Sequence, residues 1–393
     1  MQLIDPTFQE EILIRVEKIQ TELHQTDCDA LLIASNVNIF YTTGRFYRGY
    51  VYIHRSYGPL WFIVKPQIFS KEPDIFFIRK PEEIPDILNN LNLGFPASIG
   101  LELSDLSYLE IVRLQSLFPG AELKNGSAIM KNVRKIKTRW EIKEMKVDGL
   151  HQCKVYGEIN ECYQPGMTDL QLQIEIERRL RLEGALGVSR VSGNLMEINM
   201  GSVLVGDNAD NPSPYEFTMG GAGVNTSLPV GADNTKIKSG NAVMIDMNGV
   251  FNGYQTDMTR VWCLGELPEI AIEAHNTSIR ILRTLEKNSL PGTPVKDMYE
   301  TAIDIVKASG LLQYFMGHNS QVSFIGHGVG IELNELPVIN SKSKDILMPG
   351  MTIAIEPKFV IPQVGAVGVE NTYVVTPEGL ENLTVFPEEI QKF

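Results

Sequence analysis

Four carboxylates and one histidine in the carboxyl-terminal part of this chain stand in strand-like segments, where they could bind cations. They are Asp246, Asp257, His327, Glu356 and Glu370. An oxygen-rich group with one imidazole suits divalent Mn, Fe, Co or Zn. Because four ionised carboxylates carry four negative charges, which two divalent cations would offset, the charge balance favours two ions over one.

The two aspartates lie in segment 242–262, AVMIDMNGVFNGYQTDMTRVW, which contains two Asn-Gly dipeptides. Asn-Gly is the strongest short hairpin signal. A turn at 248–249 would leave Asp246 and Asp257 roughly 20 Å apart. A turn at 252–253 would make them diagonal neighbours on one face, about 7–8 Å apart. Only the second turn lets them share a cation, and the alternative is two separate, solvated aspartates.

The two glutamates lie in a second hairpin-like segment, 351–375. Glu356 and Glu370 are equidistant from Gln363, and 362–365 is a plausible turn. A hairpin that reverses there sets the two glutamates opposite each other, and like charges opposed in a sheet are destabilising. Either one carboxyl holds a proton or a cation lies between the two glutamates.

The histidine lies between these hairpins, in FIGHGVGIELNELP. Glycines flank His327, so that other backbone can approach closely and the imidazole is unobstructed. Its position near four carboxylates favours a role as a metal ligand.

The five residues, in this order and in the contexts IDMNG, TDMTR, GHGVG, IEPKF and GVENT, resemble the pita-bread metallopeptidases. These include aminopeptidase P, prolidase, methionine aminopeptidase and the metal-free relative creatinase. VRKIKTRWEIKEM resembles the start of that family's catalytic domain, and CDALLIASNVNIFYTTG resembles the amino-terminal domain of its prolidase and creatinase branch. The resemblance covers essentially the whole chain.

The resemblance implies two divalent ions (Mn, Co, Zn or Fe) bridged by Asp257 and Glu370. Asp246 would hold one ion, and His327 and Glu356 the other. A water or hydroxide between the ions would be the nucleophile, and Glu356 would take its proton as general base. The implied activity is hydrolysis of short peptides by a homodimeric Xaa-Pro dipeptidase or aminopeptidase.

The chain departs from the family at four positions. Xaa-Pro peptidases of the family usually carry histidines at the places of Pro229, Ser323 and Asn334, and prolidase-like members often carry an arginine at that of Gly368. Asn334 can still donate a hydrogen bond but cannot carry a proton, and we count it with Glu356 among the candidate catalytic residues. We consider His318, nine residues before the metal-ligand histidine, as a substitute for the missing catalytic histidine.

These departures leave two other functions open. One is a hydrolase or lyase that cleaves a C–N bond in a small non-peptide substrate, as creatinase and ectoine hydrolase do. The other is a homologue that binds metal without turnover. The missing histidines favour the non-peptide substrate more than the ligand set does.

The site requires strands, and the amino-terminal part of the chain predicts a separate α/β domain that alternates helices and strands. Helical spacing covers 8–26, and buried strands are expected at 30–34, after a turn at 58–59, and at 74–78. Together with this pattern, the resemblance implies the fold class α+β, with a creatinase-like α/β amino-terminal domain, residues 1–132, before a pita-bread catalytic domain, residues 133–393.

Two capping boxes mark helices at the start of the catalytic domain. Thr138 with Glu141 begins a helix expected to continue to Gln164-Pro165-Gly166, after a polar, basic boundary segment near 121–138. Thr168 with Gln171 begins a second helix, to about residue 182. Two further helices are expected near 268–287 and 295–310.

Composition limits the partners of the chain. Of its 393 residues 43% are apolar and 21% charged, which excludes an intrinsically disordered protein. A net charge of -13 disfavours nucleic acid, and no apolar run approaches the ~20 residues that span a bilayer. The start of the chain shows no signal peptide, and four scattered cysteines match no disulfide or zinc framework. We therefore expect a cytoplasmic protein that acts on a small peptide or another small molecule.

Overall fold

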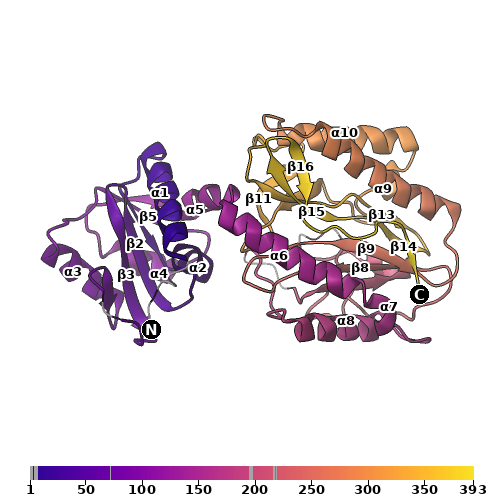
Figure 1. The fold of residues 1–393 in the computed structure, drawn as a ribbon, viewed down its shortest axis with the longest axis horizontal. Helices are drawn as coiled ribbons and strands as arrows, with labels where there is room; N and C mark the ends of the chain where they lie inside the picture. Colours follow the sequence, from indigo (N-terminus) through magenta and orange to yellow (C-terminus); the bar gives the residue numbers. More distant parts are fainter. Residues whose placement is uncertain (1–2, 4–7, 71, 194–197, 216, 218) are drawn as a thin grey trace. The chain divides into compact units, whose positions relative to one another are not determined.

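The computed structural model describes residues 3, 8–70, 72–193, 198–215, 217 and 219–393 (Figure 1). Contacts within the chain divide it into two compact units, Met1–Arg134 and Lys135–Phe393. None of the helices in the described ranges is long and apolar enough to cross a membrane.

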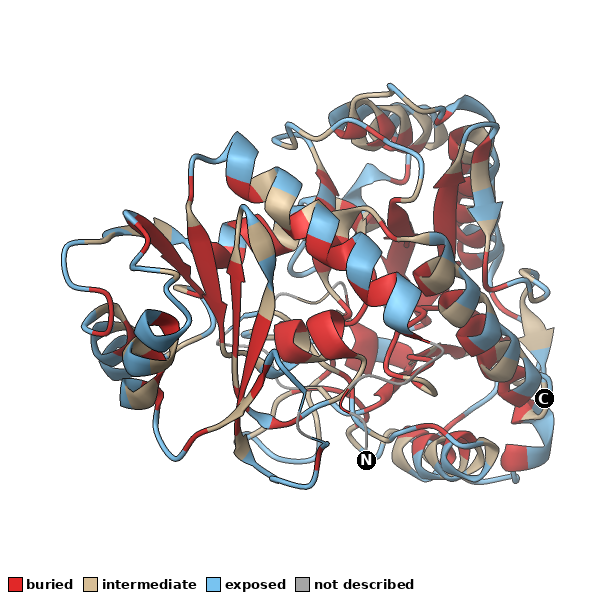
Figure 2. Cartoon of the chain, turned by 60° about the vertical axis from the view of Figure 1, so that its left-hand side comes forward, coloured by how far each residue is buried: buried red, intermediate tan, exposed pale blue. Residues whose placement is uncertain are grey.

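The amino-terminal unit contains one mixed sheet with the strand order β4-β3-β2-β1-β5-β6. The strands are β1 Ala30–Ile33, β2 Arg48–His54, β3 Tyr57–Lys65, β4 Ile75–Phe77, β5 Ser98–Leu101 and β6 Glu122–Asn125. The helices are α1 Gln9–Gln25, α2 Asn36–Thr43, α3 Ile84–Asn90, α4 Tyr108–Gln115 and α5 Gly126–Lys135. Figure 2 shows the strands of this unit as largely buried and the outer faces of its helices as exposed. The predicted helix at 8–26 and the strands at 30–34 and 74–78 are confirmed within a residue or two.

One expectation for this unit was wrong. The predicted turn at 58–59 lies inside β3, and the chain reverses at 55–56 instead. The β2–β3 register shifts between Tyr52 and His54, opposite Pro59, and such an irregularity tolerates a residue that lacks an N–H. The predicted boundary segment 121–138 does contain the division between the two units, and it is formed by β6 and α5.

The carboxyl-terminal unit contains three sheets, with the orders β17-β9-β8-β7, β11-β10-β12-β15-β16 and β13-β14. Its first strands are β7 Gly201–Val205, β8 Ala242–Met247, β9 Thr259–Cys263, β10 Phe324–Gly328, β11 Glu335–Asn340 and β12 Thr352–Ile355. The later strands are β13 Lys358–Ile361, β14 Gly365–Gly368, β15 Asn371–Thr376, β16 Gly379–Asn382 and β17 Gln391–Lys392. The helices are α6 Arg139–Tyr156, α7 Ile159–Cys162, α8 Asp169–Glu183, α9 Glu269–Asn288 and α10 Val295–Ser309.

The helices of this unit lie on the outside of the sheets (Figure 1). Apolar side chains of α9 and α10 share one core with β12, β13, β14 and β15, while α6, α7 and α8 share another with β7, β8 and β9. The capping boxes predicted at Thr138 and Thr168 are both formed. α6 ends at Tyr156, earlier than predicted.

Candidate active site

The first hairpin brings the two aspartates to one pocket. β8 pairs with β9 so that Asp246 lies opposite Thr259, and a further bridge joins Gly249 to Thr256. This register places the reversal at the second Asn-Gly dipeptide, so the second of the two predicted turns is confirmed. Asp257 precedes β9, and both aspartates line the same pocket.

The two glutamates lie where the second hairpin passes from one sheet to another. β13 pairs with β14 in the two-stranded sheet, and β12 pairs with β15 in the five-stranded sheet, in the same register. Glu356 follows β12 and Glu370 precedes β15, one step beyond the pair formed by Ile355 and Asn371. The prediction that the two glutamates face each other is confirmed.

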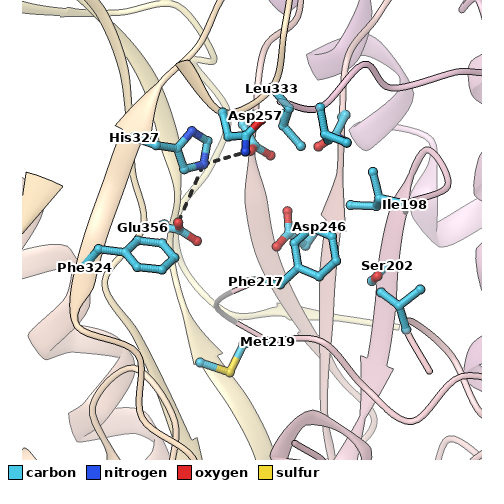
Figure 3. A pocket seen from close by; sticks show the side chains of 15 residues that line it. Ile198, Ser202, Phe217, Met219, Asp246, Asp257, Phe324, His327, Leu333 and Glu356 are labelled. Carbon is cyan, nitrogen blue, oxygen red and sulfur yellow. Dashed lines mark ion pairs between the residues drawn. The ribbon is translucent and has the colours of Figure 1, made fainter. Parts of the chain in front are cut away.

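His327 reaches these carboxylates from β10, the neighbour of β12. Its Nδ1 lies 3.0 Å from the carbonyl oxygen of Gly328. Because a carbonyl oxygen only accepts, Nδ1 carries the hydrogen, and Nε2 is the atom that faces the acids. Nε2 lies 3.7 Å from Asp257 Oδ2 and 3.7 Å from Glu356 Oε1. Figure 3 shows these three side chains pointing toward one another.

A lysine that the motif analysis left unassigned lies inside the carboxylate cluster. Lys358 Nζ donates to Asp246 Oδ2 at 2.8 Å, to Glu356 Oε2 at 2.9 Å and to Glu370 Oε2 at 2.9 Å. The lysine side chain is fully buried. Of the two alternatives for the opposed glutamates, a proton on one of them or a cation between them, the structure shows a cation, and it is an ammonium group of the chain itself.

Two buried oxygens of the cluster accept no hydrogen bond from the part of the chain that the structure describes. They are Asp257 Oδ1 and Glu370 Oε1. Asp257, Glu370 and His327 each offer a ligand atom, and these atoms lie within 4.8 Å of one another. Since leaving a buried acceptor unpaired is unfavourable, this donor set fits a divalent cation.

Burial and mutual repulsion shift the protonation of the cluster. Burial is the main cause that raises the pKa of Asp257 well above its usual value, and the charges of Glu370 and Asp246 add to it. Burial also raises the pKa of Asp246, against the effect of Lys358. Burial by itself would lower the pKa of Lys358, but the charges of Asp246, Glu356 and Glu370 outweigh it and raise that pKa well above its usual value. Lys358 is consequently a charged ammonium.

A buried guanidinium fixes the backbone that carries these acids. Arg260 donates through Nη1 to the carbonyl oxygens of Thr259, at 2.8 Å, and Glu370, at 2.7 Å. It also donates through Nη2 to Asn371 Oδ1 at 2.8 Å. Thr259 Oγ1 donates to Glu370 Oε2 at 2.6 Å. The carboxylate of Glu370 is thus held at both its backbone and its side chain.

Helix α6 and strand β15 hold the first hairpin in the same way. The Tyr156 hydroxyl accepts from the Met247 N–H at 3.0 Å and donates to the Met258 carbonyl at 2.5 Å, and so ties together the two sides of the hairpin. Thr372 Oγ1 accepts from the Asp257 N–H at 2.8 Å and lies 2.9 Å from its carbonyl oxygen. These contacts leave the acids little conformational freedom.

Asp246, Asp257 and Glu356 line one side of a pocket whose remaining wall is largely apolar (Figure 3). Its empty space of about 590 Å³ is partly open to solvent. The apolar lining consists of Val191, Ile198, Phe217, Met219, Val230, Phe324 and Leu333. The pocket therefore combines charged groups that can activate a polar bond with a surface that suits an apolar ring or side chain.

The two proposed substitute residues take different positions. His318 is not among the residues that line this pocket. Its Nδ1 lies 3.1 Å from Asp210 Oδ2, and its ring stacks on Tyr314, so the structure does not support its predicted role. Asn334 lines the pocket, but its amide is used on Ser192, accepting from the N–H at 2.6 Å and donating to the carbonyl at 2.9 Å. It is therefore placed to hold the loop around Ser192.

The positions of two missing histidines lie beside the apolar wall. Pro229 is followed by Val230 and Ser323 by Phe324, and both of these followers line the pocket. At these points the chain offers apolar surface next to the cluster.

Sequence reasoning overlooked Lys358, although a signal was available. Glu356 and Lys358 are two residues apart in an extended segment, so their side chains share a face. Gly368 and Glu370 are also two residues apart on the facing strand, and Lys358 lies opposite Gly368. Lys358 is therefore expected on the same face as both glutamates. Arg260 carried no such signal, because its acceptors are carbonyl groups brought together only by the fold.

Two family models match the chain. Metallopeptidase family M24 matches residues 143–377, and the creatinase/prolidase amino-terminal domain matches residues 15–136. The first match covers well over half of the chain.

Individual relatives match over nearly the full length. An Xaa-Pro dipeptidase of Pyrococcus furiosus is 26% identical over 390 residues, covering 96% of this chain and 99% of the relative. The crystal structure of a prolidase from Pyrococcus horikoshii has a TM-score of 0.76 at 24% identity, over 96% of this chain and 99% of that one. An Xaa-Pro dipeptidase structure from Bacillus anthracis has a TM-score of 0.79 at 22% identity, over 97% and 100%.

Proposed function

We propose that this chain hydrolyses Xaa-Pro dipeptides, because it belongs to metallopeptidase family M24. It is therefore a peptidase, and it has a creatinase-type amino-terminal domain before a pita-bread catalytic domain. Curated relatives from two Pyrococcus species are named Xaa-Pro dipeptidases. They do not favour the alternatives of a non-peptide C–N bond hydrolase or a homologue without turnover.

One observation carries this proposal. Acidic residues from two hairpins and a histidine from a third strand converge on a single pocket that has an apolar wall. A prolyl ring is apolar and rigid, and it can bury against Phe217, Met219 and Phe324, while the carboxylate side of the pocket faces the scissile bond.

We assign the groups of the site as follows. Asp257, His327 and Glu370 would hold a divalent cation, which would polarise the carbonyl group and lower the pKa of water, the chemistry that the family requires. Glu356 accepts the proton of the attacking water as general base, because one of its oxygens faces His327 at 3.7 Å within the pocket. On the other side of the cluster, the Asp246 carboxylate accepts a hydrogen bond from Lys358 and so holds the ammonium group in place.

The number of ions is the part of the expected site that fits least well. The resemblance implies a second ion, held by Asp246 and shared by Glu370. Such an ion would need carboxylate oxygens that Lys358 Nζ already occupies.

Hydrolysis of Xaa-Pro dipeptides tests the proposal. The purified chain, loaded with Mn²⁺ or Co²⁺, is assayed with Ala-Pro, Leu-Pro and Phe-Pro, and with Ala-Ala and a tripeptide as controls. Preferential cleavage of the Xaa-Pro dipeptides, abolished by a chelator and restored by metal, is the expected result. Negligible turnover across the whole panel at full metal occupancy would contradict the proposed function.

We further propose that the chain is a cytoplasmic homodimer whose domains are residues 1–132 and 133–393. Its four cysteines are all free, which suits a reducing compartment. On α4, Tyr108 and Leu109 are each 77% exposed and Val112 is 45% exposed, an apolar patch that a second copy could cover. Sedimentation that finds only 43.9 kDa monomers at micromolar concentration would contradict the dimer.

A further inference from the structure

The carboxylate cluster carries its own cation, and this bears on how many metal ions it can hold. An ammonium group has three N–H donors. All three of those of Lys358 are directed at carboxylate oxygens, one each from Asp246, Glu356 and Glu370, at 2.8–2.9 Å. The ammonium nitrogen therefore lies at the point where these three acids converge.

We propose that Lys358 replaces one of the two ions expected at this site, so that the chain binds one divalent cation, on Asp257, His327 and Glu370. This inference deepens the proposed function, on which it rests, by defining the metal content of the same site.

The division of oxygens within the cluster supports one ion. Glu370 Oε2 accepts a hydrogen bond from Lys358 Nζ, whereas Glu370 Oε1 is buried without a hydrogen-bond partner among the described residues. Asp257 Oδ1 is in the same state. Asp246 is the expected ligand of the displaced ion, but its Oδ2 accepts a hydrogen bond from the ammonium of Lys358. The oxygens left for a metal thus belong to the group around His327.

Charge and burial hold the lysine in place. Four carboxylates and one ammonium leave three negative charges, and one divalent cation reduces these to one. The side chain of Lys358 is 0% exposed. Removing one partner from such a buried ion pair leaves uncompensated charge, which is strongly unfavourable. An incoming ion therefore has to compete with three charge-assisted hydrogen bonds.

The facing strand is adapted to the lysine. Gly368, which takes the place of the arginine of prolidase-like relatives, pairs directly with Lys358. It has φ +148°, and a Cβ there would lie 2.6 Å from the Pro357 carbonyl oxygen and 2.9 Å from Lys358 Cα. A side chain at 368 is therefore excluded by this backbone.

Metal stoichiometry tests the inference. Wild-type protein and Lys358→Gly, prepared in the presence of Mn²⁺, are compared by isothermal titration and by elemental analysis. We expect one ion per chain in the wild type and two in Lys358→Gly, because the variant frees three oxygens and the space between them. Electron paramagnetic resonance should show isolated Mn²⁺ in the wild type and an exchange-coupled pair in the variant.

A matched control separates the position of the lysine from its burial. Lys137 is also buried and pairs with one carboxylate, Glu335 Oε2, at 2.9 Å. Lys137→Met should keep one ion per chain. If Lys358→Gly does not fold, the metal content of Lys358→Gln is measured in its place. The wild-type spectrum still tests whether the bound Mn²⁺ is isolated.

Two ions in the wild type, or one ion in both the wild type and a folded Lys358 variant, would overturn the inference. A wild type that binds no metal would overturn both the inference and the metal site of the proposed function. One bound ion without Xaa-Pro hydrolysis would support the inference and reject the proposed function, so the two failures are distinguishable.

Discussion

Two buried carboxylate sites in this molecule, Glu102 in the amino-terminal unit and the cluster in the candidate active site, differ in how many hydrogen-bond donors reach their oxygens. In the amino-terminal unit Glu102 is fully buried, and its Oε2 accepts from the N–H groups of Ala34 and Ser35 at 2.6 and 2.7 Å. Its Oε1 accepts from Ser35 Oγ at 2.5 Å and Asn38 Nδ2 at 2.6 Å. In the candidate active site, Asp257 Oδ1 and Glu370 Oε1 are buried with no partner among the described residues.

The difference separates a structural carboxylate from a functional one. Burial raises the pKa of Glu102 and of Asp257 alike, so burial does not distinguish them. The distinction is the supply of donors. Glu102 closes the start of α2 with four of them, which stabilises the unit. The active-site cluster keeps acceptors open and close together, which suits a cation and destabilises the chain without one.

The largest expected effect is on catalysis. Glu356→Gln keeps the shape of the side chain but removes the proposed base, so kcat/KM on Xaa-Pro dipeptides should fall by about 10³-fold. Because Glu356 lies outside the group of Asp257, His327 and Glu370, metal content should stay unchanged. Turnover equal to that of the wild type would exclude Glu356 as the base.

The next largest effect is on the stability of the amino-terminal unit, through the donors that surround Glu102. Glu102→Gln replaces one accepting oxygen by an NH₂ group and leaves donors of Ser35 and the neighbouring backbone unpaired, so the free energy of unfolding should fall by about 3 kcal/mol. Urea denaturation followed by fluorescence measures it. Glu110→Gln, in an exposed capping box of the same unit, is the control and should change stability by less than about 1 kcal/mol. Equal effects of the two substitutions would remove the contrast between the two groups.

Removing an open acceptor should have the reverse effect on stability. Asp257→Asn takes one charge out of the cluster, so the metal-free protein should become more stable by about 2 kcal/mol. The same substitution should weaken Mn²⁺ binding at least about tenfold. Thermal unfolding in chelator and titration calorimetry measure the two effects. A destabilised metal-free variant would show that Asp257 belongs to the structural class.

The smallest effect concerns an intermediate case. Asp148 accepts from the Phe251 N–H at 2.6 Å and from Thr256 Oγ1 at 3.3 Å, yet burial raises its pKa to about 7. Because the folded-state pKa lies above the unfolded one, its stabilising contribution is complete below about pH 4 and is lost as the pH rises through 7.

Asp148→Asn should remove this dependence. Relative to the variant, the wild type should lose about 1 kcal/mol of unfolding free energy between pH 6 and 7. Unfolding measured at half-unit steps of pH tests this, and parallel profiles of the two proteins would contradict it.

Sequence patterns predicted the register of the second hairpin, because the equal distance from Gln363 placed Glu356 opposite Glu370. For the first hairpin the two Asn-Gly dipeptides left two registers open, and the structure forms the one that brings Asp246 and Asp257 to one face. The same alternation extends to Lys358, but a search restricted to acids and histidines omits it. The donors to Glu102 were beyond prediction, since the Ala34 N–H and the Asn38 amide meet it only after the sheet has formed.

The change of sheet in the second hairpin also restricts how the length of the chain can vary. Glu356 and Glu370 keep their positions only while β13 and β14 stay in register, and a single residue added within either strand would turn the side chains beyond it to the other face. An addition at residues 362–364, in the turn, leaves both strands in register. We therefore expect that natural variants of this hairpin differ in length at its tip alone.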